Sequence, residues 1–457
     1  MDIPVIGVED WLNVHEHDAR WDIAQSTIAS LTMGELRALD DADGAEFYDL
    51  LDREKMDYGW IEGSAAFKDE VRRLYRHEIA DPDILQCNGA TGANLNALMA
   101  LVRPGDHVIA EWPTYAPLYE IPRTLGAEVE YWQIREELGW NPDIEDLKGL
   151  VRPDTRLICL NNASNPIGTV LPRETLHEVC DLARSVGAYV LCDEVYLPME
   201  GTGDFESIVD VYDKGIVTNS VSKTYSTPAA RCGWVIAPRE VSDAIRTHRD
   251  YTMICAGVFN DALATYVLRH KDKILARNRE ILFGNRELAQ RWIDGQPRAS
   301  WVAPRGVSTS FVKLDIPERD EDFCLRLLEE RGVLLVPGSR FELPCGVRLG
   351  YCAQPDVLAR GLELLGERVE KATAMTVADL VGTLEAIRYE LAQQLMLGNR
   401  VHLPGLGYFS LAVKGELYED PKTHKMRLRN PRVRTVNFRP EKQLLKALAD
   451  TRFENVT

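Results

Sequence analysis

The stretch from Ser220 to Arg231, SVSKTYSTPAAR, places one lysine among hydroxyl side chains and an arginine. Apolar runs at 216–217 and 234–236 flank it, so it is predicted to be a loop between two strands. A lysine condenses with an aldehyde only when it is neutral, and burial or nearby positive charge favours that form. The loop therefore predicts a reactive Lys223 beside an anion site, with a solvated surface loop as the alternative. The predicted anion-binding residues are Ser220, Ser222 and Arg231.

Three further polar landmarks follow predicted strands. Gly89-Ala90-Thr91-Gly92 opens a predicted helix, whose N-terminal N–H groups suit a phosphate. Asn165 and Asp193 each follow a buried apolar run. Because ligands in open α/β sheets bind beyond the carboxyl ends of the strands, these residues are expected to meet Lys223 at one site. A carboxylate such as Asp193 keeps a pyridine nitrogen protonated, so the set predicts a pyridoxal 5′-phosphate site with Lys223 as the Schiff-base lysine.

Strands and helices alternate from about residue 62 onwards. An apolar stripe predicts a helix over 174–185, between two of the strands. The alternation favours an α/β fold with a mostly parallel central sheet covered on both faces. A long helical stretch at about 258–294 then leads to a smaller α+β unit, which a helix at 357–370 closes. Predicted strands of the large sheet lie at 84–87, 107–109, 156–160, 189–192 and 216–218.

Four motifs occur in order along this part of the chain. They are Asn165-Pro166-Ile167-Gly168, Asp193-Glu194-Val195-Tyr196, Ser220-Val221-Ser222-Lys223 with Arg231 eight residues on, and Val347-Arg348-Leu349. With these motifs, residues from about 60 to 370 resemble the class I/II aminotransferases, the fold-type I pyridoxal-phosphate enzymes. The resemblance implies a large cofactor-binding domain at 61–295 and a small subdomain at 296–370. Residues 1–60 are then the N-terminal segment of the same unit.

The resemblance also implies roles for individual residues. Asn165 and Tyr196 are expected to hydrogen-bond the ring O3′, and Tyr115 is expected to stack on the ring. Arg348, with Asn165 beside it, is expected to bind the substrate α-carboxylate. Tyr58 is expected to reach the phosphate of a neighbouring subunit, which implies a homodimer. The remaining cofactor-binding residues are Gly89, Ala90, Thr91, Asp193, Ser220, Ser222, Lys223 and Arg231.

The expected catalytic residues are Lys223, Asp193 and Tyr196, and the expected substrates are an amino acid and a 2-oxo acid. Aminotransfer is the leading prediction, while elimination, replacement or cyclisation stays open. The segments 9–12, 30–36 and 249–252 are similar to the subgroup that contains capreomycidine synthase. The segment 22–26 lacks the glycine usual in the family near the substrate, so the substrate stays open as well. A regulator that senses the cofactor is the alternative from another class, although such regulators carry an N-terminal winged helix that this sequence lacks.

The tail, residues 371–457, follows a different pattern. A helix is predicted from a cap at Thr376 to Leu397, then a long hairpin over 414–436 with a turn at 420–425, and a last helix over 442–450. Gly405-Leu406-Gly407-Tyr408-Phe409 and the hairpin resemble the HU/integration host factor family over about 75 residues. The first helix of that family is absent, or 357–370 takes its place. The resemblance implies an α+β domain that contacts DNA through Arg427, Arg429, Arg432, Arg434 and Pro421. A dimerisation or interaction module without DNA binding is the alternative.

Charge separates the two parts of the chain. The whole chain of 457 residues carries −18, but residues 371–457 hold 14 Lys and Arg against nine Asp and Glu. The remaining residues therefore carry −23. Such a change of sign indicates two modules with different partners, so any DNA binding is expected from the tail.

The location of the protein is indicated by its cysteines. The nine cysteines form no Cys-x-x-Cys pair, and several lie in apolar runs, which predicts reduced thiols in the cytoplasm. No run of about 18 apolar residues occurs, so no membrane span is expected. No metal site is predicted either. Asp41-Ala42-Asp43-Gly44 resembles part of a calcium loop, but leucines stand at both outer ligand positions.

Overall fold

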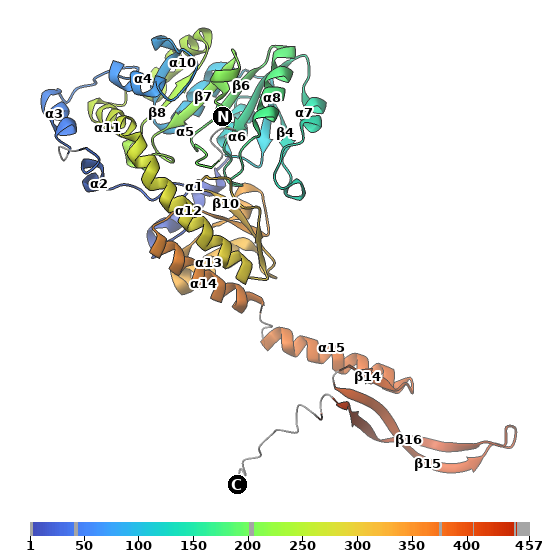
Figure 1. Cartoon of the computed structure of the whole chain (residues 1–457). Coiled ribbons are helices and arrows are strands. Elements are labelled where there is room, and N and C mark those ends of the chain that lie inside the picture. The colour runs from blue at the N-terminus through green and yellow to red at the C-terminus, as the bar shows by residue number, and fades with distance from the viewer. Residues whose placement is uncertain are drawn as a thin grey trace. The chain divides into compact units, whose positions relative to one another are not determined.

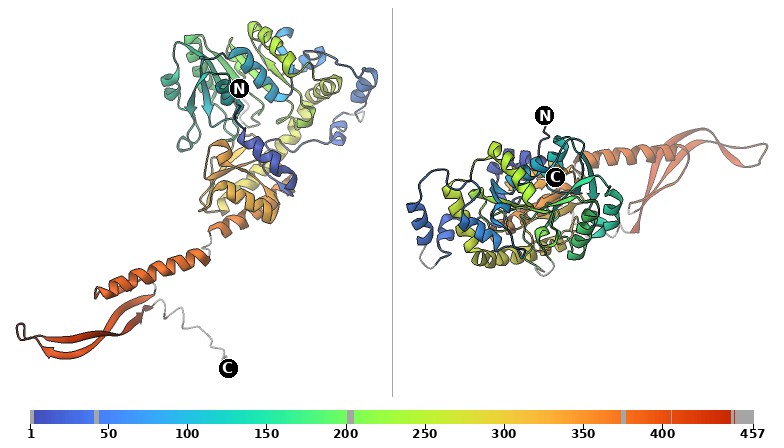
Figure 2. Two further views of the ribbon diagram at one scale, coloured as in Figure 1. Left: turned by 180° about the vertical axis from the view of Figure 1, so that it is seen from behind. Right: turned by 90° about the horizontal axis from the view of Figure 1, so that it is seen from above.

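The computed structural model describes residues 3–40, 44–200, 205–373, 377–404, 406–442 and 445. Contacts divide the chain into two compact units, Met1–Thr373 and Ala374–Thr457. This division lies three residues from the boundary that the sequence predicts at residue 371. Figure 1 shows the elements of both units, and Figure 2 shows them from two further sides.

The first unit contains a seven-stranded sheet in the order β2-β8-β7-β6-β5-β3-β4. Neighbouring strands from β7 to β4 run parallel, and β8 alone among the seven runs antiparallel to both of its neighbours. The predicted mostly parallel sheet is therefore confirmed. The strands are β2 (Ile84–Cys87), β3 (His107–Trp112), β4 (Glu128–Gln133), β5 (Thr155–Asn161), β6 (Tyr189–Asp193), β7 (Gly215–Ser220) and β8 (Gly233–Ile236).

Both faces of this sheet are buried, which explains the apolar strands. Along β5, Leu157 and Cys159 pack into one core cluster, whereas Ile158 and Leu160 pack into another. Successive side chains of a strand point to opposite faces, so each face has its own layer of helices. Helices α5 (Gly89–Leu101), α6 (Pro117–Thr124) and α10 (Arg239–Thr252) cover one face, and α8 (Arg173–Val186) and α11 (Val258–Arg269) cover the other.

A small subdomain follows the large one. Its antiparallel sheet has the order β12-β13-β10-β9 and is covered by α13 (Asp320–Arg331) and α14 (Pro355–Thr373). The helical stretch predicted over 258–294 is two helices, α11 and α12 (Lys271–Gly295), which are separated at His270. Helix α12 runs from the large part of the unit to the small one (Figure 1). The strands are β9 (Ala299–Trp301), β10 (Ser310–Leu314), β12 (Val336–Pro337) and β13 (Gly346–Leu349).

The N-terminal segment, for which the sequence predicts no elements, folds onto the small subdomain. Helix α1 (Gly7–His15) is held there by Trp11, whose indole Nε1 donates to the carbonyl oxygen of Leu335 at 2.8 Å. Strand β1 (Trp21–Asp22) pairs in parallel with β11 (Val333–Leu334). Figure 2 shows α1 beside the small subdomain. This packing carries residues 9 and 26 to the edge of the large sheet. Two further helices of the segment are α2 (Met33–Arg37) and α3 (Ala45–Arg53).

In the described part of the second unit, α15 (Val377–Met396) is followed by a three-stranded antiparallel sheet. The predicted hairpin is confirmed and is longer than expected, with β15 (Gly407–Glu419) paired to β16 (Met426–Pro440). The predicted turn closes it, because the Asp420 N–H donates to the Lys425 carbonyl at 3.0 Å. Strand β14 (Val401–Leu403) pairs with β15. The predicted cap at Thr376, Gly405 and most of the predicted helix over 442–450 lie outside the described residues.

The described residues offer neither a membrane-spanning helix nor a metal cluster. Within those ranges, no helix is both long and apolar enough to cross a membrane. In the same part of the chain, no group of three or more His, Cys, Asp or Glu side chains is placed to hold a metal ion. The calcium-like segment at 41–43 lies outside the ranges.

Candidate active site

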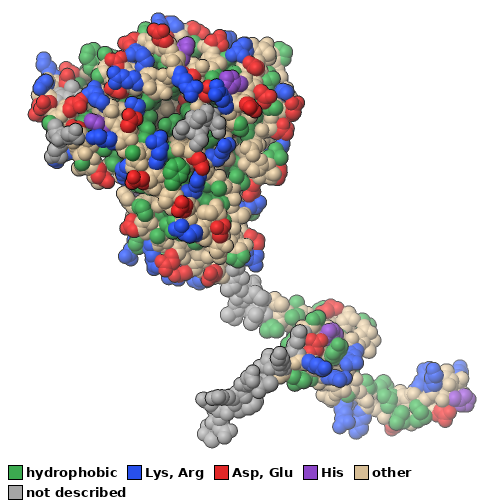
Figure 3. All heavy atoms as spheres, viewed as in Figure 1, with side chains coloured by type: hydrophobic (Ala, Val, Ile, Leu, Met, Phe, Trp, Pro, Cys, Tyr) green, Lys and Arg blue, Asp and Glu red, His purple; other side chains and the backbone are tan. Residues whose placement is uncertain are grey.

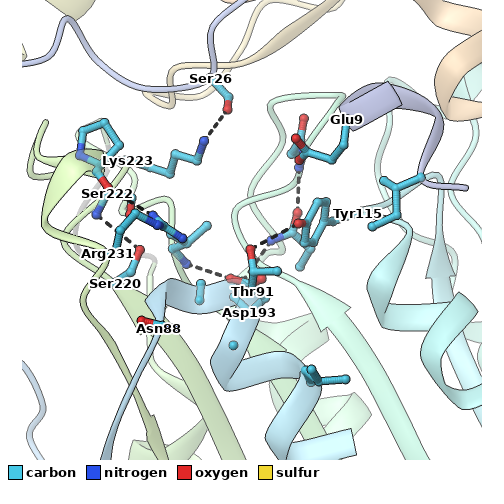
Figure 4. Close-up of a pocket in the computed structure, with 18 of the residues that line it drawn as sticks. Glu9, Ser26, Asn88, Thr91, Tyr115, Asp193, Ser220, Ser222, Lys223 and Arg231 are labelled. Atoms are coloured by element: carbon cyan, nitrogen blue, oxygen red, sulfur yellow. Dashed lines mark hydrogen bonds between the residues drawn. The ribbon is translucent and has the colours of Figure 1, made fainter. Parts of the chain in front are cut away.

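A cavity of about 620 Å³ lies at the carboxyl ends of the strands, between the large sheet and the small subdomain. It is lined by every residue predicted for the cofactor and substrate except Gly89 and Tyr58. Figure 4 shows Lys223 with Ser26 on one side of the opening, Glu9 with Tyr115 on the other, and Asp193 with Thr91 on the floor. The predicted residues in its lining are Ala90, Thr91, Tyr115, Asn165, Asp193, Tyr196, Ser220, Ser222, Lys223, Arg231 and Arg348.

Lys223 follows β7 and is half-buried in this cavity. Its Nζ donates to the Ser26 hydroxyl oxygen at 2.8 Å. Burial, with the cationic Arg348 and Arg231 nearby, lowers the pKa of Lys223 to about 8, although the Glu9 and Asp193 carboxylates act the other way. An amine with this pKa is partly neutral near pH 7, so it can serve as a nucleophile or as a base.

Asp193 ends β6 and is buried at the floor of the cavity. Its carboxylate accepts a hydrogen bond from Asn94 Nδ2 at 2.7 Å and one from the Val195 N–H at 3.1 Å. Burial raises the pKa of Asp193 to about 6, against the effect of these donors. The Thr218 hydroxyl donates to Asn94 Oδ1 at 2.5 Å and fixes the amide with its NH₂ towards Asp193. The Asp193 carboxylate is thus held in one orientation by its two donors and is ionised at neutral pH.

The predicted anion site forms where α5 begins. Gly89 has φ +65°, and a Cβ there would lie 2.8 Å from Arg231 Nη2. Only glycine therefore lets the guanidinium approach the N-terminus of the helix. The Ser222 N–H donates to the Ser220 hydroxyl at 3.2 Å, which brings both serines to the same place. Hydroxyls, an arginine and helix N–H groups together form a cradle that suits a phosphate.

Arg348, in β13, lies on the opposite wall and is buried. Its Nη1 donates to Asn165 Oδ1 at 3.2 Å and its Nη2 to the Ala24 carbonyl at 2.8 Å. Its Nε is buried without a hydrogen-bond partner among the described residues. The guanidinium is thus oriented by the protein and keeps donor capacity for a carboxylate.

Two tyrosines complete the wall. Burial raises the pKa of Tyr196 to about 12, so its phenol is neutral and can donate a hydrogen bond. Burial raises the pKa of Tyr115 as well, and its hydroxyl lies 3.3 Å from the Thr91 hydroxyl. Both rings line the cavity beside Asp193, where an aromatic cofactor ring could pack.

Several lining residues are missed by the sequence motifs. Glu9 and Ser26 come from the N-terminal segment, and Asn161 ends β5. Asn94 could have been noticed as a polar residue on the buried side of a predicted helix, one turn after the glycine loop. Tyr58, by contrast, is 66% exposed and does not line the cavity. Its expected contact requires a second subunit, so it stays a prediction.

These side chains fit pyridoxal 5′-phosphate group by group. A carboxylate is available for the ring nitrogen, a lysine of lowered pKa for the aldehyde and a cradle for the phosphate. The close approach of Arg231 to Gly89, which any Cβ would block, is what this cradle needs. The residues present are therefore those that the cofactor requires.

The hairpin of the second unit has two different faces. Arg427, Arg429 and Arg432 lie opposite Tyr418, Glu416 and Lys414 in the register. An irregularity in the pairing between Lys414 and Glu416 gives β16 one extra residue, so the three arginines share one face. The four arginines therefore do not alternate regularly along β16, and Arg434 lies at a second irregularity. The other face is apolar and exposed, with Val413, Leu417 and Val433.

Two of the predicted DNA-contacting arginines have partners within the hairpin. Arg427 forms an ion pair with Asp420 at 2.9 Å, and the Arg429 guanidinium lies 4.9 Å from the centre of the Tyr418 ring. Pro421 is in the turn between the two strands. Figure 3 shows basic, acidic and hydrophobic side chains together on the hairpin.

Comparison with known families divides the chain at the same region. The family model described as aminotransferase class I and II matches residues 37–365. The model described as HU domain fused to wHTH, Ig, or glycine-rich motif matches residues 359–455. Both predicted resemblances are thereby confirmed. The second match begins inside α14, although this helix packs on the small subdomain of the first unit.

Individual relatives agree with the first match. A solved PLP-dependent aminotransferase from Streptococcus suis is 52% identical, covers 82% of this chain and 100% of its own, and has a TM-score of 0.79. Capreomycidine synthase from Streptomyces vinaceus is 29% identical over 376 residues, which are 80% of this chain and 94% of the synthase. Aspartate aminotransferase from Thermotoga maritima is 30% identical over 300 residues, which are 64% and 77% of the two chains. With a family model that spans most of its length and a cavity that collects the motif residues, the chain belongs to the class I and II aminotransferases.

Proposed function

We propose that the protein is a pyridoxal-phosphate-dependent aminotransferase that acts on an amino acid and a 2-oxo acid. The observation that carries the proposal is the single cavity that brings together Lys223, Asp193, Arg231 and Arg348. When bound there, the cofactor would supply an electron sink for the bonds at the amino-acid Cα. The roles of the chain's own residues follow from their geometry.

Lys223 is the base in this proposal. Its Nζ, with a pKa of about 8, can remove a proton from the amino-acid Cα and donate a proton in a later step of the reaction. The Ser26 hydroxyl accepts a hydrogen bond from Nζ and orients it. Asp193 holds a proton at the ring nitrogen, and Asn94 keeps that carboxylate in place. Arg231 and the serines bind the phosphate.

Arg348 positions the substrate. Its guanidinium is held by Asn165 and by the Ala24 carbonyl, so it can bind the α-carboxylate without rearranging. A planar fork fixes the carboxylate in two directions, which orients the Cα–H bond relative to Lys223. Tyr196 and Asn165 would hydrogen-bond the ring O3′.

Incubation of the holoprotein with amino acids and 2-oxo acids tests the proposal. We expect a new amino acid to form from the 2-oxo acid, and borohydride to fix the cofactor on Lys223, as identified by peptide mass. Lys223→Ala should lose the borohydride-stable linkage and the transfer, yet retain cofactor through its phosphate. A stable adduct on a different lysine would contradict the assignment.

Cyclisation is the second candidate, and one observation favours it. The similarity to capreomycidine synthase extends over 376 residues and includes nearly the whole of that protein. Chromatography of the products separates the two reactions, since a cyclase forms a ring product and leaves the 2-oxo acid unchanged. A cofactor-sensing regulator would give neither product.

We further propose that the enzyme is a homodimer in the cytoplasm. Tyr58 lies within a group of exposed apolar side chains that includes Met56, Trp60 and Ile61, and a second subunit would cover them. Sedimentation of the wild type and of Trp60→Glu measures this, with a monomer expected for the variant. The cytoplasmic location is supported by nine free cysteine thiols, seven of which are buried.

For the tail we propose DNA binding through the arginine face of the hairpin, with Pro421 at the tip. The alternative is association between tails through the apolar face of the same hairpin. The ion pair of Arg427 with Asp420 reduces the charge available for phosphates, so the expected affinity is low.

A further inference from the structure

The charged side chains of the cavity can be matched to the groups that any amino-acid reaction brings there. Among the described lining residues, five are charged at neutral pH, namely Glu9, Asp193, Lys223, Arg231 and Arg348. Under the proposed function, Arg231 meets a phosphate, Asp193 a ring nitrogen, Lys223 an aldehyde and Arg348 an α-carboxylate. Glu9 is left without a counterpart in the cofactor or in the part of the substrate that all amino acids share.

Glu9 lies in the lining of the cavity, across its opening from Lys223. It is on α1 and reaches into the opening opposite Lys223 and Ser26, beside Tyr115 (Figure 4). Its negative charge favours the charged forms of Lys223 and Arg348 and so acts to raise the pKa of each. The next residue, Asp10, turns away and forms an ion pair with Arg340 at 3.0 Å. Glu9 itself has no ion-pair partner among the described residues.

The same helix supplies apolar surface around this carboxylate. Ile6, Val8 and Leu12 line the cavity together with Glu9. A wall that is apolar along its length and carries one acid matches a side chain with a methylene stem and a positive head. An acidic substrate side chain would instead be repelled by the Glu9 charge, and a short neutral one would leave Glu9, which is exposed, in contact with water.

We propose that Glu9 determines substrate specificity and that the enzyme acts on an amino acid with a cationic side chain, a guanidinium or an ammonium. The inference rests on the proposed function, because it names the substrate class of the same site. Glu9 contacts the head of the substrate side chain, and Ile6, just before α1, contacts its stem together with Val8 and Leu12 of α1. The reacting atoms stay with Lys223.

Paired substrates test this in the holoenzyme. L-Arginine and L-citrulline have nearly the same shape and differ in charge, so their kcat/KM ratio measures recognition of the charge. A hydrogen-bonded ion pair at the cavity wall predicts a ratio of about ten or more in favour of L-arginine. The preference should lie mainly in KM, and in the Kd from absorbance titration of the bound cofactor, because Glu9 does not touch the reacting atoms.

Variants of two adjacent acids make the test specific. Glu9→Gln should bring the ratio close to one, Glu9→Asp should keep part of it, and Glu9→Arg should shift the preference towards L-glutamate. Asp10→Asn removes one charge from the same helix without facing the cavity, so it should leave the ratio unchanged. If Glu9→Gln lowers kcat/KM equally for both substrates, Glu9 acts only by supporting Arg348, and the inference is wrong.

Failure of this inference can be told apart from failure of the proposed function. If amino acids are converted but L-arginine has no advantage over L-citrulline, the specificity inference alone is wrong. If no amino acid changes the absorbance of the bound cofactor or yields a product, the proposed function is wrong and the inference falls with it.

Discussion

Burial shifts the pKa values of two residues in the cavity towards each other. The pKa of Lys223 is lowered to about 8 and that of Asp193 is raised to about 6. In each case burial disfavours the charged form, which is the protonated amine in one residue and the ionised carboxyl in the other. The Lys223 amine and the Asp193 carboxyl thereby titrate near neutral pH, where their protonation states can control the binding of cofactor to the apoprotein.

We predict that attachment of pyridoxal phosphate to the apoprotein depends on pH in two steps. The lysine reacts as the neutral amine, so the rate should rise through pH 8 and level off above it. The carboxylate must be ionised to pair with a ring N–H, so affinity should fall as the pH drops below about 6. Stopped-flow absorbance and equilibrium titration measure the two steps. A rate that is constant between pH 7 and 9 would contradict the environment described for Lys223.

Replacement of Asp193 separates charge from shape. Asp193→Asn keeps the size but cannot stabilise a proton on the ring nitrogen, so we expect Cα proton exchange to slow about a hundredfold or more. Asn94→Ala should have a smaller effect, since Asn94 acts only by orienting the carboxylate. Exchange of the Cα proton for deuterium, followed by NMR, reports this step directly. Equal exchange rates in Asp193→Asn and the wild type would exclude the role.

Arg348 provides the corresponding test for substrate binding. Arg348→Lys replaces a planar fork by a point charge, so we expect KM for the amino acid to rise about tenfold while kcat changes less. Cofactor absorbance in the absence of substrate should change little, because the new lysine keeps a positive charge near Lys223. If amines without a carboxylate react as well as amino acids, Arg348 does not bind the α-carboxylate.

At the scale of elements, the register of the hairpin decides what its arginines can do. The extra residue in β16 places Arg427, Arg429 and Arg432 on one face and leaves the apolar side chains on the other. We predict that replacing Arg427 and Arg429 by Ala weakens binding of duplex DNA and lowers the slope of log K against log salt. Each lost phosphate contact should change that slope by about 0.9. Gel-shift titrations at several salt concentrations measure both quantities.

Arg400→Ala is the matched control for these variants. Arg400 lies over the Tyr408 ring and is outside β16, the strand that carries the three arginines. The control should bind DNA with nearly the wild-type slope. If the control and the double variant lose DNA affinity equally, binding depends on the overall charge of the tail and not on the arginine face.

At the scale of the whole molecule, the two units carry opposite charge. Residues 371–457 hold 14 basic and nine acidic side chains, whereas the rest of the chain carries −23. The acidic unit should repel DNA, so we predict that the isolated tail, residues 374–457, binds duplex DNA more tightly than the full chain does. Fluorescence anisotropy at low salt makes the comparison. If the isolated tail dimerises but DNA shows no anisotropy change, the tail serves in association and not in DNA binding.

Prediction from sequence succeeded where local patterns carry the information. The strands are apolar because both faces of the sheet are buried, and polar residues such as Asp193 stand at their carboxyl ends. The boundaries of individual helices and strands follow less directly from local pattern. The helix predicted over 258–294 is broken at His270, and β4 at 128–133 was not predicted because its side chains are mostly half-exposed and polar. The hairpin register could not be predicted, because it depends on two irregularities in the pairing.

The sequence by itself determined the fold class and the cofactor chemistry, and it predicted the residues that are proposed to serve that chemistry. Lys223, Asp193 and Arg348 are recognisable because each stands in a motif at a strand end or within a strand, and local pattern is enough to find it. Only the tertiary structure decided that Glu9 and Ser26 join them. Their place depends on the packing of α1 against the small subdomain, more than 300 residues further along the chain, as in the hydrogen bond from Trp11 to Leu335. Contacts over such separations leave no periodic trace in a sequence. The sequence therefore marks the segments 9–12 and 22–26 without showing that Glu9 and Ser26 reach the cavity.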